Sequence, residues 1–161
     1  MYNNTKWEIN KPKSIIIPGI QMHTNQVFHC WNNPLLALFL KNFFYNIYDP
    51  ILFEIEVDKI VSDNGIIFAS KMQTITKKLD LPQINKKQQH IFYIRMAKIM
   101  DVDERLNALD DRIILNNSLF LSHVSNVIFN VYKYYNMFTE TEVKKSLNKK
   151  LIDIATDIIE L

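Results

Sequence analysis

Two carboxylates and a histidine–threonine pair are the candidate catalytic and cofactor-binding residues of this sequence. Glu54 and Glu56 stand two residues apart in an alternating apolar segment, so on a strand their side chains share one face. Paired carboxylates on one face suit general acid–base work. His23 and Thr24 follow a strand-like run, where an exposed His-Thr pair can hold the ribose of a nucleotide. The catalytic candidates are therefore His23, Glu54 and Glu56, and the cofactor-binding candidates are His23 and Thr24; a plain loop and a solvated sheet face are the alternatives.

The segment 27–35, VFHCWNNPL, places a histidine, the single cysteine and a tryptophan in succession. On a strand, His29 and Cys30 point to opposite faces and cannot bind one metal together. The chain has no CxxC, HxxxH or HExxH motif, so we expect no metal site. Asn33 is a good N-cap, and Pro34 is tolerated at the first position of a helix. The segment therefore predicts a structural corner, with Cys30 as a buried thiol, rather than a catalytic site.

The charge of the chain is unevenly distributed. Residues 1–100 carry 12 Lys and Arg against 7 Asp and Glu, whereas residues 101–161 carry 7 against 10. A basic front could steer an anionic partner, although ordinary scatter of charge over a surface is the alternative. Few aromatic residues are interleaved with the lysines of the basic stretch, which are Lys71, Lys77, Lys78, Lys86 and Lys87. A protein partner is therefore favoured over nucleic acid, which prefers denser charge or stacking residues.

The predicted secondary structure changes near residue 82, from mainly strands to helices. Before it, strands are predicted over 14–17, 27–30 and 51–57, and a nearly all-apolar helix over 35–46. A turn at 63–65 leads to a strand over 66–69, which we expect to pair with the strand 51–57. We predict an α+β chain with a small antiparallel or mixed sheet in its N-terminal half. It would be one domain over 1–161, with an α+β part to about residue 82.

The part from about residue 83 to 161 is predicted to be helical. Helices are expected over 87–100 and 113–138, with Asp101 as a cap between them and Glu104 three residues later. Thr139 and Glu142 form a Thr-x-x-Glu capping box ahead of a final helix. The apolar stripe expected along that last helix consists of Val143, Leu147, Leu151, Ile154 and Ile158.

Composition also bounds the compartment. One cysteine allows no internal disulfide and fits a reducing compartment. The first 13 residues lack the apolar stretch of a signal peptide, and no window of about 20 residues is free of polar groups. We therefore predict a cytoplasmic protein with no membrane partner, in the host cytoplasm if the chain is viral.

Part of the chain resembles a family of small uncharacterised domains of phage genomes. That family carries a phrase like GFHFCxNPL, then a strand, then a lysine-bearing segment that leads to an LxL pair. The residues that match these phrases are His29, Cys30, Asn33, Pro34 and Leu35, followed by Ser70, Lys71, Leu79 and Leu81. The resemblance covers under half of the chain, Val27 stands where the family has glycine, and no activity is implied.

More distantly, the layout is similar to compact ADP-ribosyltransferase folds, in which a His-Thr strand precedes a helix with an A-x-x-Y motif. His23 and Thr24 match the first element, and Ala37 begins the motif. Leu40 occupies the tyrosine position and the gap after the histidine is short, which argues against an active transferase. The similarity implies NAD as the ligand, whereas the catalytic glutamate of these folds is not identified in this sequence and Glu54 and Glu56 are only candidates for it.

Two functions follow from these patterns. The first is a non-enzymatic, phage- or viral-type module that binds a protein, such as a host factor, and needs no cofactor. It rests on the apolar helix 35–44 and on the aromatic-rich stretch 129–138. The alternative is a small ADP-ribosyltransferase-like enzyme, or an inactive relative that binds NAD.

Overall fold

The computed structural model of the chain describes residues 7–19, 26–44, 51–63, 65, 67–80, 82–138 and 141–160. Within these residues the strands are β1 Pro12–Ser14, β2 Phe28–Trp31, β3 Leu52–Val57, β4 Ile60–Asp63, β5 Ile67–Ser70 and β6 Met72–Leu79. The helices are α1 Pro34–Phe44, α2 Lys86–Ile99, α3 Glu104–Asn107, α4 Asp111–Leu115, α5 Ser118–Phe138 and α6 Thr141–Ile159. The predicted α+β class is confirmed, with all the described strands before residue 82 and all helices but α1 after it.

The chain divides into two compact units. The described residues up to Pro34, together with 51–80, form a sheet unit. The described residues from Leu35 to Phe44, together with those from Pro82 onward, form a helical unit. α1 therefore packs with the C-terminal helices, although strands flank it in the sequence.

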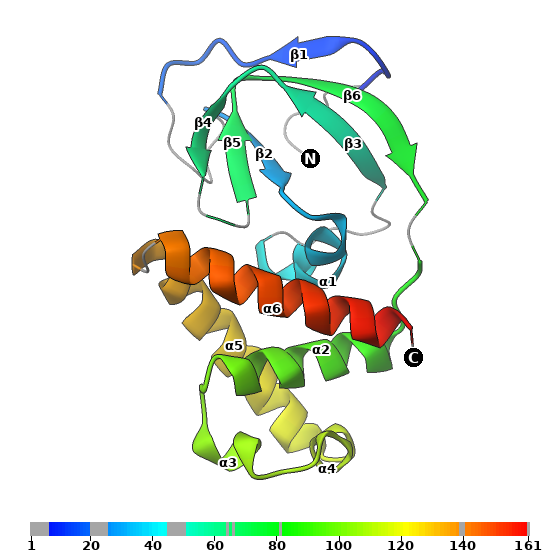
Figure 1. The fold of residues 1–161 in the computed structure, drawn as a ribbon, viewed down its shortest axis with the longest axis vertical. Helices are drawn as coiled ribbons and strands as arrows, with labels where there is room; N and C mark the ends of the chain where they lie inside the picture. The colour runs from blue at the N-terminus through cyan, green and yellow to red at the C-terminus, as the bar shows by residue number, and fades with distance from the viewer. Residues whose placement is uncertain are drawn as a thin grey trace. The chain divides into compact units, whose positions relative to one another are not determined.

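The sheet unit is built on one long hairpin that bends. β3 and β6 pair antiparallel, as do β4 and β5 (Figure 1). Only Asp58 and Lys59 separate β3 from β4, and only Lys71 separates β5 from β6. β1 adds to β6 and β2 adds to β5, which gives two three-stranded antiparallel sheets of order β1-β6-β3 and β2-β5-β4. Bends and register shifts of this kind allow strands to pass from one sheet to the next.

Strand pairing corrects the sequence prediction. The segment 66–69 was expected to pair with β3, yet β5 pairs with β2 and β4. The true partner of β3 is β6, a stretch for which the sequence indicated no strand because its lysines break the alternation. The strand predicted over 14–17 is also displaced, since β1 ends at Ser14 and Ile16 is 93% exposed.

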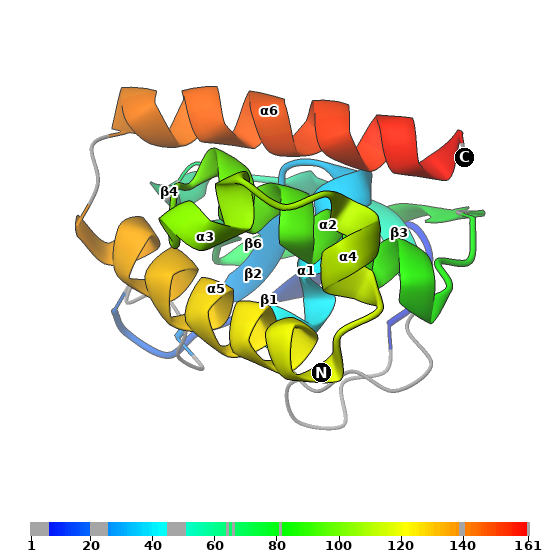
Figure 2. The same cartoon turned by 90° about the horizontal axis from the view of Figure 1, so that it is seen from below.

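α2 is the centre of the helical unit and contacts α3, α4, α5 and α6 (Figure 2). Its start is fixed by a capping box, because Asn85 Oδ1 accepts from the Gln88 amide at 2.9 Å while Gln88 Oε1 accepts from the Asn85 amide at 3.1 Å. The Phe92 ring stacks on Phe39 of α1 at a centroid distance of 4.5 Å. Gln89 Nε2 donates to the Phe39 carbonyl at 2.7 Å, which fixes α1 against α2.

Apolar side chains fill both units. In the sheet unit the buried apolar residues include Val27, Cys30, Ile67, Ala69 and Ile75. In the helical unit α1 is buried at all five positions 36–40, so these side chains belong to the core and do not form the docking surface on which the protein-binding prediction partly rested. The other buried side chains there include Phe92, Ile94, Met96, Leu106, Ile114, Val124, Ile128, Tyr132, Leu151 and Ile158.

Helix boundaries in the C-terminal part differ from the prediction at two points. The helix expected over 113–138 is broken at residues 116–117, where Asn117 Oδ1 accepts from the amides of Leu119 and Phe120 at 3.1 and 3.2 Å and starts α5. The cap of α3 is Asp103 rather than Asp101. Asp101 has a φ of 49° and follows the last turn of α2, a position that favours glycine.

The inward face of the last helix includes two polar side chains that its apolar pattern does not predict. Val143 is 49% exposed, whereas Lys144 and Asn148 are 8% and 5% exposed. Leu147, Leu151 and Ile158 are buried, as predicted. The residues Thr139 and Glu140 of the predicted capping box lie outside the described residues.

Candidate functional site

The residues predicted to do chemistry are not assembled by the described part of the chain. His23 and Thr24 lie outside the described residues. Glu54 and Glu56 are both exposed on β3, opposite Lys77 and Thr74 of β6. Their exposure fits the alternative of a solvated sheet face. The acid–base role of the two glutamates and the NAD site remain predictions.

The segment VFHCWNNPL forms a corner of the sheet unit. Cys30 is 5% exposed, and Gln73 Nε2 of the neighbouring sheet donates to its sulfur. Burial raises the pKa of the Cys30 thiol to about 12, so the thiol stays protonated and is a poor nucleophile at neutral pH. Asn32 Nδ2 donates to the Gly65 carbonyl at 2.5 Å and ties the corner to the β4–β5 connection. These contacts give Cys30 and Asn32 structural roles.

The predicted basic stretch is divided by the fold. The Lys71 ammonium donates to the carbonyls of Ile17 at 2.5 Å and Gln26 at 2.6 Å, so it holds these two residues against the bend of the hairpin. Lys77 and Lys78 are exposed on β6 of the sheet unit. The remaining two lysines of the stretch, at 86 and 87, begin α2 of the helical unit.

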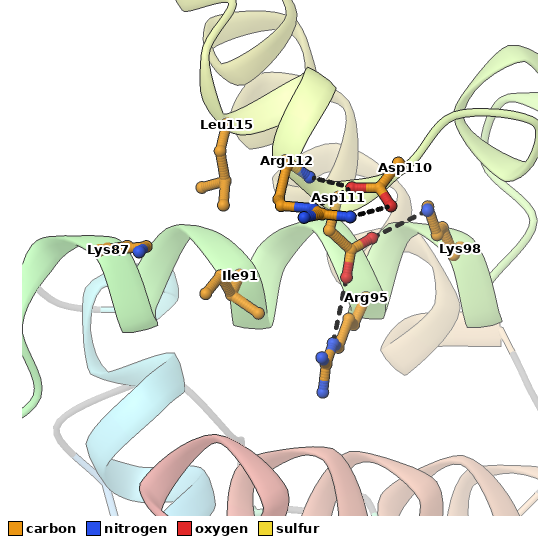
Figure 3. A pocket seen from close by; sticks show the side chains of 8 residues that line it. All are labelled: Lys87, Ile91, Arg95, Lys98, Asp110, Asp111, Arg112 and Leu115. Carbon is orange, nitrogen blue, oxygen red and sulfur yellow. Dashed lines mark hydrogen bonds and ion pairs between the residues drawn. The ribbon is translucent and has the colours of Figure 1, made fainter. Parts of the chain in front are cut away.

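A pocket of about 470 Å³ lies between α2 and α4 in the helical unit (Figure 3). Its lining residues come from one stripe of α2 and from the start and end of α4: Lys87, Ile91, Arg95, Lys98, Asp110, Asp111, Arg112 and Leu115. The four α2 residues share a face because they are spaced by four, four and three. Figure 3 shows Leu115 projecting from α4 toward the part of α2 that carries Lys87 and Ile91.

Ion pairs organise one half of this pocket. Asp111 accepts from Lys98 Nζ at 2.8 Å and from Arg95 Nε at 3.2 Å. Lys98 also donates to the Leu109 carbonyl at 2.6 Å, so two of the three N–H donors of its ammonium are engaged. Asp110 caps α4 through the Arg112 amide at 2.8 Å. The Arg112 side chain also hydrogen-bonds to Asp110 and lowers the pKa of that carboxyl, which keeps it ionised at neutral pH.

The pocket carries more positive than negative charge. Four cationic side chains line it against the two carboxylates of Asp110 and Asp111. Among the described residues, the exposed Lys87 ammonium has no hydrogen-bond or ion-pair partner. Arg95 contacts through Nε the same Asp111 carboxylate that pairs with Lys98, so two cations share one anion. An anionic group that enters the pocket therefore meets cations that are not yet neutralised.

The start of α2 adds to the positive charge of the pocket. Its first turn contains two lysines and no acidic residue, and the whole helix carries neither Asp nor Glu. Positive side chains at a helix N-terminus add to the positive end of the helix dipole instead of offsetting it, which disfavours the helix locally. An anion bound near Lys87 would offset both the charge of the lysines and the positive end of the helix dipole. Deviations from local rules of this kind are concentrated at functional sites.

Sequence reasoning missed this pocket, although one signal for it was present. The spacing of Lys87, Ile91, Arg95 and Lys98 identifies a basic stripe on the helix predicted over 87–100. The other wall of the pocket is α4, which is a separate helix because the helical run breaks between α4 and α5. The prediction of one continuous helix over 113–138 did not include this break. Within the part of the chain that the structure describes, no group of three His, Cys, Asp or Glu side chains could hold a metal ion.

None of the described helices has the length and apolar run needed to cross a bilayer. The resemblance to phage domains and the predicted location stay predictions. Comparison of the chain with protein-family models, curated proteins and solved structures gave no match.

Proposed function

We propose that this chain is a non-enzymatic module that binds an acidic segment of a partner protein at the α2–α4 pocket. The observation that carries the proposal is the excess of positive charge in the pocket, where Lys87 has no partner among the described residues. Such an excess steers acidic partners to the surface and selects against basic ones.

The arrangement of the ion pairs supports binding rather than catalysis. Asp111 holds Arg95 and Lys98 in place, so their charges are positioned before a partner arrives. Preorganised side chains lose less conformational entropy when the complex forms. The apolar lining of Ile91 and Leu115 gives a partner surface to bury beside the charges.

A protein partner fits the pocket better than a nucleic acid does. Among the described residues that line it there is no aromatic side chain on which a base could stack, and the two carboxylates repel a continuous phosphate chain. An acidic peptide places its carboxylates at intervals, with uncharged residues between them. The pocket likewise offers both cations and uncharged apolar surface.

The proposal is tested by titrating the full ¹⁵N-labelled chain with a decapeptide of alternating glutamate and serine. Amide shifts are expected to concentrate on α2 and α4. The same peptide with glutamine for glutamate controls for charge, and single-stranded deca-thymidine tests nucleic acid. Absence of shifts with the glutamate peptide up to millimolar concentration contradicts the proposal, as does stronger binding of the oligonucleotide to the same residues.

A further inference from the structure

The α2–α4 pocket has two chemically different ends. We call Lys87, Ile91 and Leu115 the aliphatic end. The other end contains the paired charges Arg95, Lys98, Asp110, Asp111 and Arg112. Hence the cation without a described partner lies beside the two aliphatic walls, and the charges that pair with one another lie together.

The geometry points to a specific anchor, and this inference rests on the proposed function. The aliphatic end receives an aliphatic side chain of the partner between Ile91 and Leu115, and an adjacent carboxylate of the partner pairs with Lys87. The recognised element is therefore an acidic residue next to a leucine-like residue. Acidic residues alone would leave the aliphatic walls in contact with water.

Physical complementarity supports this anchor. Ile91 and Leu115 are both half-buried, so part of each side chain still faces the pocket. Covering that surface with an apolar group is favourable in proportion to the area removed from water. The Lys87 ammonium is four residues from Ile91 on one helical face, within reach of the residue that follows the anchor. The volume of about 470 Å³ lies within the range of ligand pockets, about 300–1,000 Å³.

The end of the pocket that contains the paired charges contributes by holding α4, and with it Leu115, in place against α2. Asp111 joins α4 to α2 through Lys98 and Arg95, and this connection fixes how far Leu115 stands from Ile91. A preformed gap favours one side-chain size over another. The aliphatic end should therefore discriminate leucine from alanine.

The test compares three acidic decapeptides that differ at one central position, which is leucine, alanine or serine between glutamates. Binding to the full-length protein is measured by NMR titration. The leucine peptide is expected to bind about tenfold more tightly than the alanine peptide. Since the change is made in the peptide, the result does not depend on the folding of a protein variant.

Leu115→Ala and Ile91→Ala, each checked by its ¹⁵N spectrum, are expected to abolish most of the preference for leucine while the serine peptide binds as before. Equal affinities of the leucine, alanine and serine peptides for the wild-type chain would overturn the anchor and leave the proposed function standing. Failure of all three peptides to bind would overturn the proposed function itself.

Discussion

The carboxylate of Asp111 on α4 accepts a hydrogen bond of 2.8 Å from the Lys98 ammonium on α2, and its other oxygen accepts from Arg95 at 3.2 Å. One side chain therefore does two things. It fastens α4 to α2, and it neutralises part of the positive charge that lines the pocket. The first effect favours the binding of an acidic partner, because it positions the pocket, and the second disfavours it, because it removes positive charge. Substitution of Asp111 can therefore test which effect is larger.

Asp111→Asn is predicted to increase the affinity for the acidic decapeptide several-fold, because Lys98 and Arg95 lose their internal anion and face the ligand. The free energy of unfolding should fall by no more than about 1–2 kcal/mol, since both pairs are partly exposed. Titration and denaturant unfolding measure the two effects. Asp153→Asn on the exposed face of α6 is the matched control. Weaker binding by a folded Asp111→Asn variant contradicts the prediction.

Lys71→Met is predicted to lower the free energy of unfolding by about 1.5–3 kcal/mol, the range of hydrogen bonds to charged groups. The reason is the loss of the ammonium that donates to the carbonyls of Ile17 and Gln26. Lys77→Met, at an exposed position of β6, should change stability by about 0.5 kcal/mol or less. Equal effects of the two substitutions in urea unfolding would show that Lys71 is not a clamp.

Cys30 is predicted to resist alkylation in the folded protein. Its thiol is buried and its pKa is raised to about 12, so very little thiolate is present at neutral pH. The rate of reaction with iodoacetamide should rise by orders of magnitude when guanidinium unfolds the chain. A native rate comparable to that of a free thiol would refute the structural role of this corner.

His90 is predicted to make stability depend on pH. Burial, and then the charge of Lys86, lower the pKa of His90 from its ordinary value of 6.5. The unfolded chain therefore takes up the proton first as the pH falls, and the native state is penalised. Stability should be complete above about pH 6.5 and decrease below it, until the lowered pKa is reached.

His90→Gln removes this titration, so melting temperatures between about pH 7.5 and 5.5 should vary less for the variant than for the wild-type chain. His123→Gln is a useful comparison because it makes the same substitution at an exposed histidine, which hydrogen-bonds to Asp103 at 3.2 Å. A pH dependence that His90→Gln leaves unchanged would contradict the assignment.

Local signals in the sequence predicted the elements well where one stretch of chain determines them. The Asn-Pro step located the start of α1 at Pro34, and the alternation of 51–57 located β3. The corner at Cys30 followed from the face alternation of a short strand. α2 was predicted over 87–100 and spans Lys86–Ile99.

Features that depend on distant residues could not be predicted in this way. The pairing of β3 with β6 needs the bend at Lys71, which is stabilised by carbonyls more than 40 residues away in sequence. The inward face of α6 includes the buried Lys144 and Asn148, so tertiary packing overrides the apolar pattern. The pocket needs α4 to fold back on α2 through Asp111, a contact that hydrophobic periodicity does not encode.

A charge reversal at Lys87 tests most directly whether this lysine binds an acidic residue of the partner. Affinity for the leucine-containing acidic decapeptide would be measured by calorimetry for the wild-type chain, Lys87→Glu and Lys149→Glu. Lys149 is exposed on α6 and does not line the pocket, so it matches the change in net charge. We expect about a tenfold loss of affinity for Lys87→Glu and little change for Lys149→Glu. Equal affinities of the two variants would contradict this expectation.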